Sequence, residues 1–157
     1  MGKTASEIRM GRADAMGPSY KTLSVITAGD LELRPADSYF YSESRIPCYE
    51  FLIFVGGEEA GTYYGLIEGD LEKVRESGNV GVEINEPFRG RDLPAKATRA
   101  MIPFFREQGL DTILITTDKG NLAIHKACEH LSASYLDTID SQPPGKQIDR
   151  FLLKIKS

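Results

Sequence analysis

Apolar and polar positions alternate most clearly in the middle of the chain, between residues 48 and 85. The stretch CYEFLIFV is apolar and rich in strand-forming residues, GGEE has the composition of a hairpin turn, and AGTYYGLIEG resumes the alternation. In NVGVEINE, three apolar residues then alternate with three others: Val80, Val82 and Ile84 against Gly81, Glu83 and Asn85. The pattern predicts a β-hairpin followed by a third strand that ends at Pro87.

The second half of the chain has the pattern of helices alternating with strands. Apolar residues recur at helical spacings after residue 96: Ala97, Ala100, Met101, Phe104 and Phe105. We expect Gly109 to end this helix, and Pro103 to bend it or end it early. DTILITT then predicts a buried strand, residues 121–131 a second helix, and SYLDTI and RFLLKI two final strands.

The N-terminal third has a weaker pattern. EIRMGRA, Glu7 to Ala13, is interpreted as a short strand, YKTLSVI has helical or strand character, and RPADSYFYSES is interpreted as a loop or short irregular helix that covers a binding cleft. The hairpin requires antiparallel neighbours, whereas strand, helix, strand, helix requires a parallel pair with a crossover. The predicted fold class is therefore α/β, with a mixed, mostly antiparallel sheet, a central parallel strand pair and flanking helices.

Composition and charge narrow the classes of function. A chain of 157 residues with 41% hydrophobic and 27% charged residues is typical of one globular domain, here residues 1–157. A net charge of −4 without a basic stripe argues against a nucleic-acid partner, and the longest apolar run, FLIFV, is too short for a membrane span. Two cysteines in dissimilar surroundings, without a secretory signal pattern, predict a cytoplasmic protein.

FRGRDLPAKA lies between the third strand and the long helix, where a helix N-terminus offers unpaired amides and a positive dipole end. Arg89 and Arg91 add charge and donors to this anion site. Asp92 either faces the anion or turns outward and caps the helix, and Pro94 removes one donor. We therefore expect weakened anion binding. The alternative is a plain strand-to-helix turn with a capping aspartate.

With this order of elements, the segment from Gly78 to Ala133 resembles the core of the GCN5-related N-acetyltransferases. In that family a loop of pattern Q/R-x-x-G-x-G/A opens a helix whose amides hold the pyrophosphate of acetyl-CoA. Here the loop reads RGRDLP, which matches at its first position and departs at both small positions. The resemblance implies an acyl-CoA N-acyltransferase-like fold, acetyl-CoA as cosubstrate, and these cofactor-binding residues: Ile84, Arg89, Gly90, Arg91, Asp92, Leu93, Ala95 and Asn121.

The resemblance also implies candidates for the chemistry, which is direct attack of a deprotonated amine on the thioester. An amide near Ile84 polarises the thioester carbonyl, where the strand bulges to admit the pantetheine arm. Glu83 is the candidate base, or else a solvent-facing strand residue. The family's tyrosine acid falls on Cys128, which is otherwise a small buried residue, and its Gly-Phe pair falls on residues 132–133.

Two further pairs bear on the site. Of Tyr63 and Tyr64 on the neighbouring strand, one is expected on the cleft face and the other in the core. His125 and His130 are five residues apart on one helix and hence on different faces, which argues against a metal site.

The resemblance implies an N-acetyltransferase of a small-molecule primary amine. One alternative is a catalytically degenerate module that keeps the fold and binds or regulates. A second is an acyltransferase of protein N-termini or lysines, which an acidic cleft near Glu50, Glu58 or Glu68 would favour. The final strand pairs either within the sheet or across a homodimer, and the sequence leaves both open.

Overall fold

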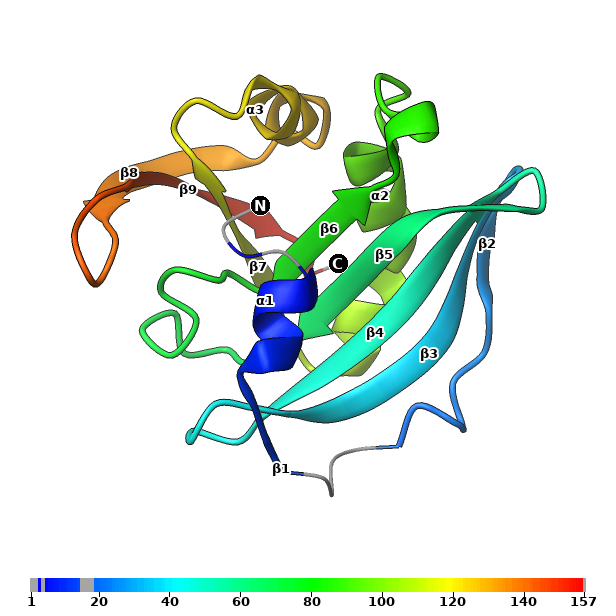
Figure 1. Cartoon of the computed structure of the whole chain (residues 1–157), viewed down its shortest axis with the longest axis horizontal. Coiled ribbons are helices and arrows are strands. Elements are labelled where there is room, and N and C mark those ends of the chain that lie inside the picture. The colour runs from blue at the N-terminus through cyan, green and yellow to red at the C-terminus, as the bar shows by residue number, and fades with distance from the viewer. Residues whose placement is uncertain (1–2, 4, 15–18, 157) are drawn as a thin grey trace.

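The computed structural model describes residue 3, residues 5–14 and residues 19–156. Its strands form two antiparallel sheets (Figure 1). The first has the order β1-β3-β4-β5-β6, with β2 also on β3, and contains β1 (Arg12–Asp14), β2 (Ile26–Ala28), β3 (Leu31–Tyr41), β4 (Ile46–Val55), β5 (Glu58–Leu66) and β6 (Val80–Ile84). The second has the order β7-β9-β8 and contains β7 (Thr112–Asp118), β8 (Ser134–Asp140) and β9 (Gln147–Lys154).

Helices cover both faces of the first sheet (Figure 1). These are α1 (Ala5–Met10) on one face and α2 (Leu93–Glu107), preceded by the 3-10 turn η1 (Glu86–Phe88), on the other, whereas α3 (Leu122–His130) packs on α2 and on β7 of the second sheet. The apolar face of α2 packs on one side, where the Phe104 ring meets Tyr49 and Phe51 edge-on at centroid distances of 5.4 Å. On the other side, Ile8 of α1 is fully buried in a separate cluster with Tyr39 and Tyr64.

The strongest sequence patterns are confirmed. The hairpin is β4 and β5, the third strand is β6, and the second half folds as α2, β7, α3, β8 and β9. The predictions for the N-terminal third agree less well with the structure. Most of the stretch from Glu7 to Ala13 is helix α1, not strand, with Ile8 buried in the core, and β1 begins only at Arg12. YKTLSVI is irregular up to Val25, and β2 begins only at Ile26.

The predicted loop at RPADSYFYSES is wrong, because most of it belongs to β3, an 11-residue strand that pairs with β4 along its length. A register shift between Pro35 and Asp37 interrupts its alternation, so Leu33 and Tyr39, an even number of residues apart, are buried in different clusters on opposite faces of the sheet. Pro103 does not end α2 either. The helix continues to Glu107, with Pro103 on its exposed side.

The predicted parallel pair is β6 and β7, which α2 connects, and the two strands meet at their starts before they diverge (Figure 1). Asn79 joins them. Its backbone N–H donates to the Leu114 carbonyl and its Oδ1 accepts from the Leu114 N–H, both at 2.8 Å. Its Nδ2 donates to the carbonyls of Leu66 and Glu68, both at 2.9 Å. The predicted fold class is confirmed, with the sheet divided in two at this pair.

Candidate active site

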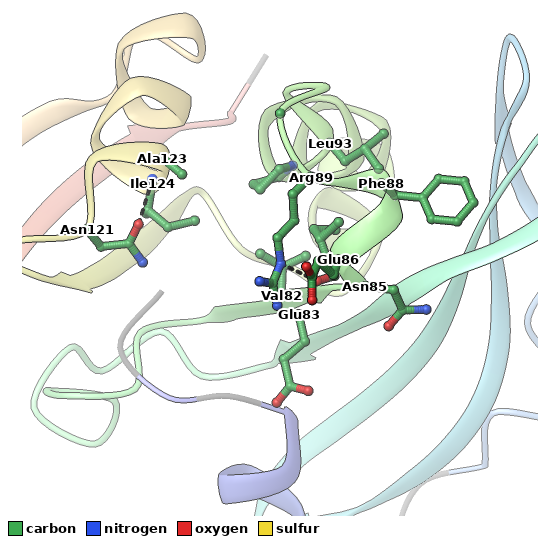
Figure 2. A pocket seen from close by; sticks show the side chains of 13 residues that line it. Val82, Glu83, Asn85, Glu86, Phe88, Arg89, Leu93, Asn121, Ala123 and Ile124 are labelled. Atoms are coloured by element: carbon green, nitrogen blue, oxygen red, sulfur yellow. Dashed lines mark hydrogen bonds between the residues drawn. The ribbon is translucent and has the colours of Figure 1, made fainter.

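A cavity of about 860 Å³ opens where β6 and β7 diverge, within the roughly 300–1,000 Å³ usual for small-molecule sites. Figure 2 shows its walls, which come from β6, η1, the start of α2 and the start of α3. The lining residues are Val82, Glu83, Ile84, Asn85, Glu86, Phe88, Arg89, Gly90, Leu93, Pro94, Asn121, Ala123 and Ile124. The cavity therefore contains six predicted site residues: Glu83, Ile84, Arg89, Gly90, Leu93 and Asn121.

Strand β6 presents a backbone edge to this cavity. Successive residues of an antiparallel strand direct their N–H and C=O alternately toward one neighbour and away from it. The Asn85 amide donates to the Ala60 carbonyl at 2.7 Å, so Ile84 directs its N–H and C=O away from β5. β6 pairs with β5 without a register shift, so the expected bulge at Ile84 is not found. The edge is exposed because β6 and β7 separate.

The loop before α2 keeps the backbone shape of a glycine-rich turn. Gly90 has φ +82° and Asp92 has φ +58°, so Asp92 adopts a left-handed conformation at the position where the resembling motif has glycine. The first helical bond is Lys96 N–H to the Asp92 carbonyl at 3.1 Å. The amides of Leu93 and Ala95 precede that bond, whereas Pro94 has none to offer.

Asp92 takes neither of the two orientations that the sequence suggested. Its carboxylate does not cap α2, and Asp92 does not line the cavity. Instead its Oδ2 lies 2.8 Å from Nδ1 of His130, at the end of α3. Arg91 also lies outside the lining, with its guanidinium 5.0 Å from the centre of the Phe88 ring. Ala95 is fully buried.

Arg89 turns its side chain back toward β6. Its backbone N–H donates to the Glu86 carbonyl at 3.2 Å, and its Nε donates to the Ile84 carbonyl at 3.0 Å. In Figure 2 the side chain runs across the cavity toward Val82. The one guanidinium of the cavity lining is therefore held against the backbone edge of β6.

Helix α3 begins at the opposite wall. Asn121 caps it by accepting from the Ile124 N–H at 3.3 Å, as its sequence position suggests. Nδ1 of His125 lies 2.6 Å from the Asn121 carbonyl, and its Nε2 lies 2.7 Å from Oδ2 of Asp149. Burial lowers the pKa of His125, but these two acceptors together raise it above its usual value. Both ring nitrogens face acceptors, so the protonated ring fits best and fixes the start of α3.

Glu83 lies on the other side of β6 from Val82 and Ile84, and its side chain extends toward α1 (Figure 2). Tyr64 shares this face. Its ring covers Gly81, where an added Cβ would lie 1.8 Å from the ring, and its hydroxyl donates to the Lys3 carbonyl at 2.8 Å. Tyr63 packs toward α2 and donates to Thr98 at 3.2 Å. The two tyrosines therefore face opposite sides of the sheet as predicted, but both are fully buried and neither lines the cavity.

Cys128 does not reach the cavity. It lies on the buried face of α3, within the hydrophobic core, and this burial raises its pKa to about 11. Glu50, one of the residues whose acidic cleft would have favoured a protein acceptor, is 2% exposed and paired with Arg9. Among the described residues, no group of three or more His, Cys, Asp or Glu side chains is placed to hold a metal ion. No helix within the described ranges has the length and apolar character to span a membrane.

Sequence reasoning missed several wall residues, among them Asn85, Glu86 and Ile124. Asn85 and Glu86 follow the carboxyl end of β6, and polar residues at that end of a strand beside a crossover were the available signal. Ile124 belongs to an apolar helix face, and nothing local distinguishes a cavity wall from a core contact.

No family model matches the sequence, and no curated protein does. Solved structures match in fold. The ribosomal L7/L12 alpha-N-protein acetyltransferase RimL is 17% identical, with a TM-score of 0.67 over 85% of this chain and 99% of its own. The putative acetyltransferase YncA of Salmonella typhimurium, solved with acetyl-CoA, is 14% identical, with a TM-score of 0.56 over 71% and 66%. The microcin C7 self-immunity acetyltransferase MccE, solved with acetyl-CoA and AMP, is 10% identical, with a TM-score of 0.57 over 68% and 61%. The chain thus has the GCN5-related N-acetyltransferase fold.

Proposed function

We propose that this chain is an acetyl-CoA-dependent N-acetyltransferase whose acceptor is the primary amine of a small molecule. The observation that carries the proposal is the cavity itself. Its lining contains Glu83, whose carboxylate extends from β6 toward α1, the backbone edge of β6 at Ile84 and the amino end of α2 at Leu93. These are the base, the carbonyl-polarising donor and the anion site that acyl transfer from a coenzyme A thioester requires.

The chain's residues fit the cofactor in two parts. For the pyrophosphate, the loop offers Gly90, which lets the backbone approach closely, the amide of Leu93 and the Arg89 guanidinium. Arg91, on the Phe88 ring, and the buried Ala95 lie outside the cavity lining and are assigned no contact. The carboxylate of Asp92, held by His130, does not enter the cavity lining. For the pantetheine arm, the Ile84 edge offers its C=O, which accepts from Arg89 Nε in this structure, and the Ile84 N–H is left for the thioester carbonyl.

When bound, acetyl-CoA supplies an acetyl group activated as a thioester. The Ile84 N–H donates to the carbonyl oxygen where negative charge develops, and Glu83 accepts the proton that the amine gives up. The amine nitrogen bonds to the acetyl carbon, the carbon–sulfur bond breaks, and the thiolate takes up a proton from solvent. The positive end of α3 at Asn121 stabilises negative charge at the same wall. Because Cys128 lies outside the cavity, it takes no part in this scheme.

A protein N-terminal amine is the second candidate acceptor. The RimL match covers nearly all of that chain, whereas the YncA and MccE matches each cover about two thirds of theirs. RimL, by its name, acetylates the α-amine of a protein. Small amines and serine-initiated peptides, assayed side by side, separate the two acceptor classes.

Calorimetry with acetyl-CoA tests the proposal first, and thiol release in the presence of an amine and peptide panel tests it second. We expect micromolar binding and turnover with at least one acceptor. Glu83→Gln should lower kcat/KM by about 10²- to 10⁴-fold with coenzyme A affinity unchanged. Glu43→Gln, at the exposed turn between β3 and β4, is the matched control. No binding and no thermal shift at millimolar acetyl-CoA would reject the enzyme, and binding without turnover would favour the degenerate module.

A further inference from the structure

Arg89 is placed to contact two different parts of the cavity, the backbone edge of β6 and the anion site at α2. Its main chain is anchored by the N–H bond to the Glu86 carbonyl, whereas its side chain is exposed and bonded to Ile84. A long exposed side chain changes rotamer at small cost, so the guanidinium can exchange partners without movement of the loop.

We propose that Arg89 covers the pantetheine edge in the free protein and leaves it when the pyrophosphate arrives. This inference rests on the function proposed above and adds a positioning role to Arg89. Binding of one half of the cofactor then prepares the chain for the other half.

Two physical arguments support an exchange of partners. A guanidinium bonds more strongly to a phosphate oxygen than to a neutral carbonyl, because both partners are then charged. The Ile84 carbonyl, which Arg89 occupies, points into the cavity and is the acceptor that an amide-bearing chain needs to pair with β6. A ligand with a pyrophosphate therefore offers Arg89 a stronger partner and frees the Ile84 carbonyl. Pantetheine alone must displace Arg89 without such compensation.

The other arginine of the loop does not have this geometry. Arg91 stacks on the Phe88 ring at 5.0 Å and lies outside the cavity lining, so its removal should not affect the Ile84 edge. Arg91→Ala therefore serves as a matched comparison, with the same loss of charge two residues away.

The experiment measures affinities for reduced pantetheine and for coenzyme A by calorimetry. We expect Arg89→Ala to weaken coenzyme A binding about tenfold or more, since it loses a charge-assisted bond, and to tighten pantetheine binding roughly threefold to tenfold. Arg91→Ala should leave pantetheine affinity unchanged. Arg89→Lys keeps the charge without the planar fork, so its coenzyme A affinity should lie between those of the wild type and Arg89→Ala.

A second measurement uses the wild-type chain alone. At constant ionic strength, inorganic pyrophosphate should tighten pantetheine binding, and Arg89→Ala should abolish this coupling. Loss of affinity for both ligands alike in Arg89→Ala, or pyrophosphate without effect on pantetheine in the wild type, would overturn the covering role. If the wild type binds coenzyme A while these results fail, only this inference is wrong. If it does not bind coenzyme A at all, the proposed function fails with it.

Discussion

Asp92 shows how one residue keeps the shape of a loop while changing its chemistry. Its φ of +58° lies in the left-handed region, which glycine adopts without steric strain and aspartate tolerates. The side chain compensates by reaching His130, which ties the loop to the end of α3. Aspartate in place of the motif's glycine therefore keeps the same backbone conformation. Its carboxylate lies outside the cavity lining.

We predict that Asp92→Gly and Asp92→Ala differ in stability although both lose the His130 contact. Glycine relieves the left-handed strain, so its free energy of unfolding should stay within about 0.5 kcal/mol of the wild type. Alanine keeps the strain and should lose roughly 1–2 kcal/mol. Urea denaturation measures both. Equal values for the two variants would mean that the positive φ is not what costs stability here.

The residues of the site were predictable to different degrees. Glu83, Ile84, Arg89 and Asn121 were predicted from the resemblance to the acetyltransferase motif, and the structure puts them in one cavity. Whether Asp92, Arg91 and Cys128 reach the cavity depends on the direction of each side chain. The partner of Asp92 lies on another helix, 38 residues away, and no local pattern reveals it.

At the scale of elements, α2 contains two prolines in different contexts. Pro94 is in the first turn, where the N–H it lacks would have no helical partner. Pro103 is inside the helix, where the missing N–H leaves the Arg99 carbonyl without its usual donor. The helix continues past Pro103 because its apolar face, with Met101, Phe104 and Phe105, is buried against the sheet. Tertiary packing thus outweighs the local helix breaker that the sequence shows.

The same substitution at the two prolines should therefore give different results. Pro103→Ala restores the backbone donor and should raise the free energy of unfolding by about 1–3 kcal/mol. Pro94→Ala should change it by less than about 0.5 kcal/mol. Chemical denaturation of both variants is the measurement. A gain at Pro94 as large as at Pro103 would contradict this account of α2.

Strand β3 illustrates why the N-terminal elements were harder to predict. Its alternation is broken by the register shift between Pro35 and Asp37, and polar residues and a proline interrupt its apolar positions, although β3 pairs with β4 as a hairpin. The hairpin of β4 and β5, by contrast, combines a local turn with an apolar run on either side. The hairpin was recognisable although its pairing also shifts register, between Ile53 and Phe54, because its apolar runs are continuous, whereas the polar composition of β3 hid a strand.

In the molecule as a whole, the two sheets meet at one corner, formed by the starts of β6 and β7, and the cavity lies where these strands separate. Asn79 joins the two strands at this corner. It is fully buried and bonds to β7 through Leu114 and to the end of β5 through Leu66 and Glu68. The opening of the β6 edge above it, and hence the donor at Ile84, depends on the two strands being held together at their starts alone.

Asn79→Ala should therefore destabilise the whole chain. It leaves the Leu114 N–H and the Leu66 carbonyl buried without their side-chain partner, and each such group costs about 1–3 kcal/mol, so we expect a loss of roughly 3 kcal/mol in urea denaturation. Asn85→Ala is the matched control, since Asn85 is exposed and makes one long contact, 3.4 Å to the Glu59 carbonyl. Its loss should be below about 0.5 kcal/mol. If the two variants unfold alike, other contacts hold the corner, and the width of the cavity does not depend on Asn79.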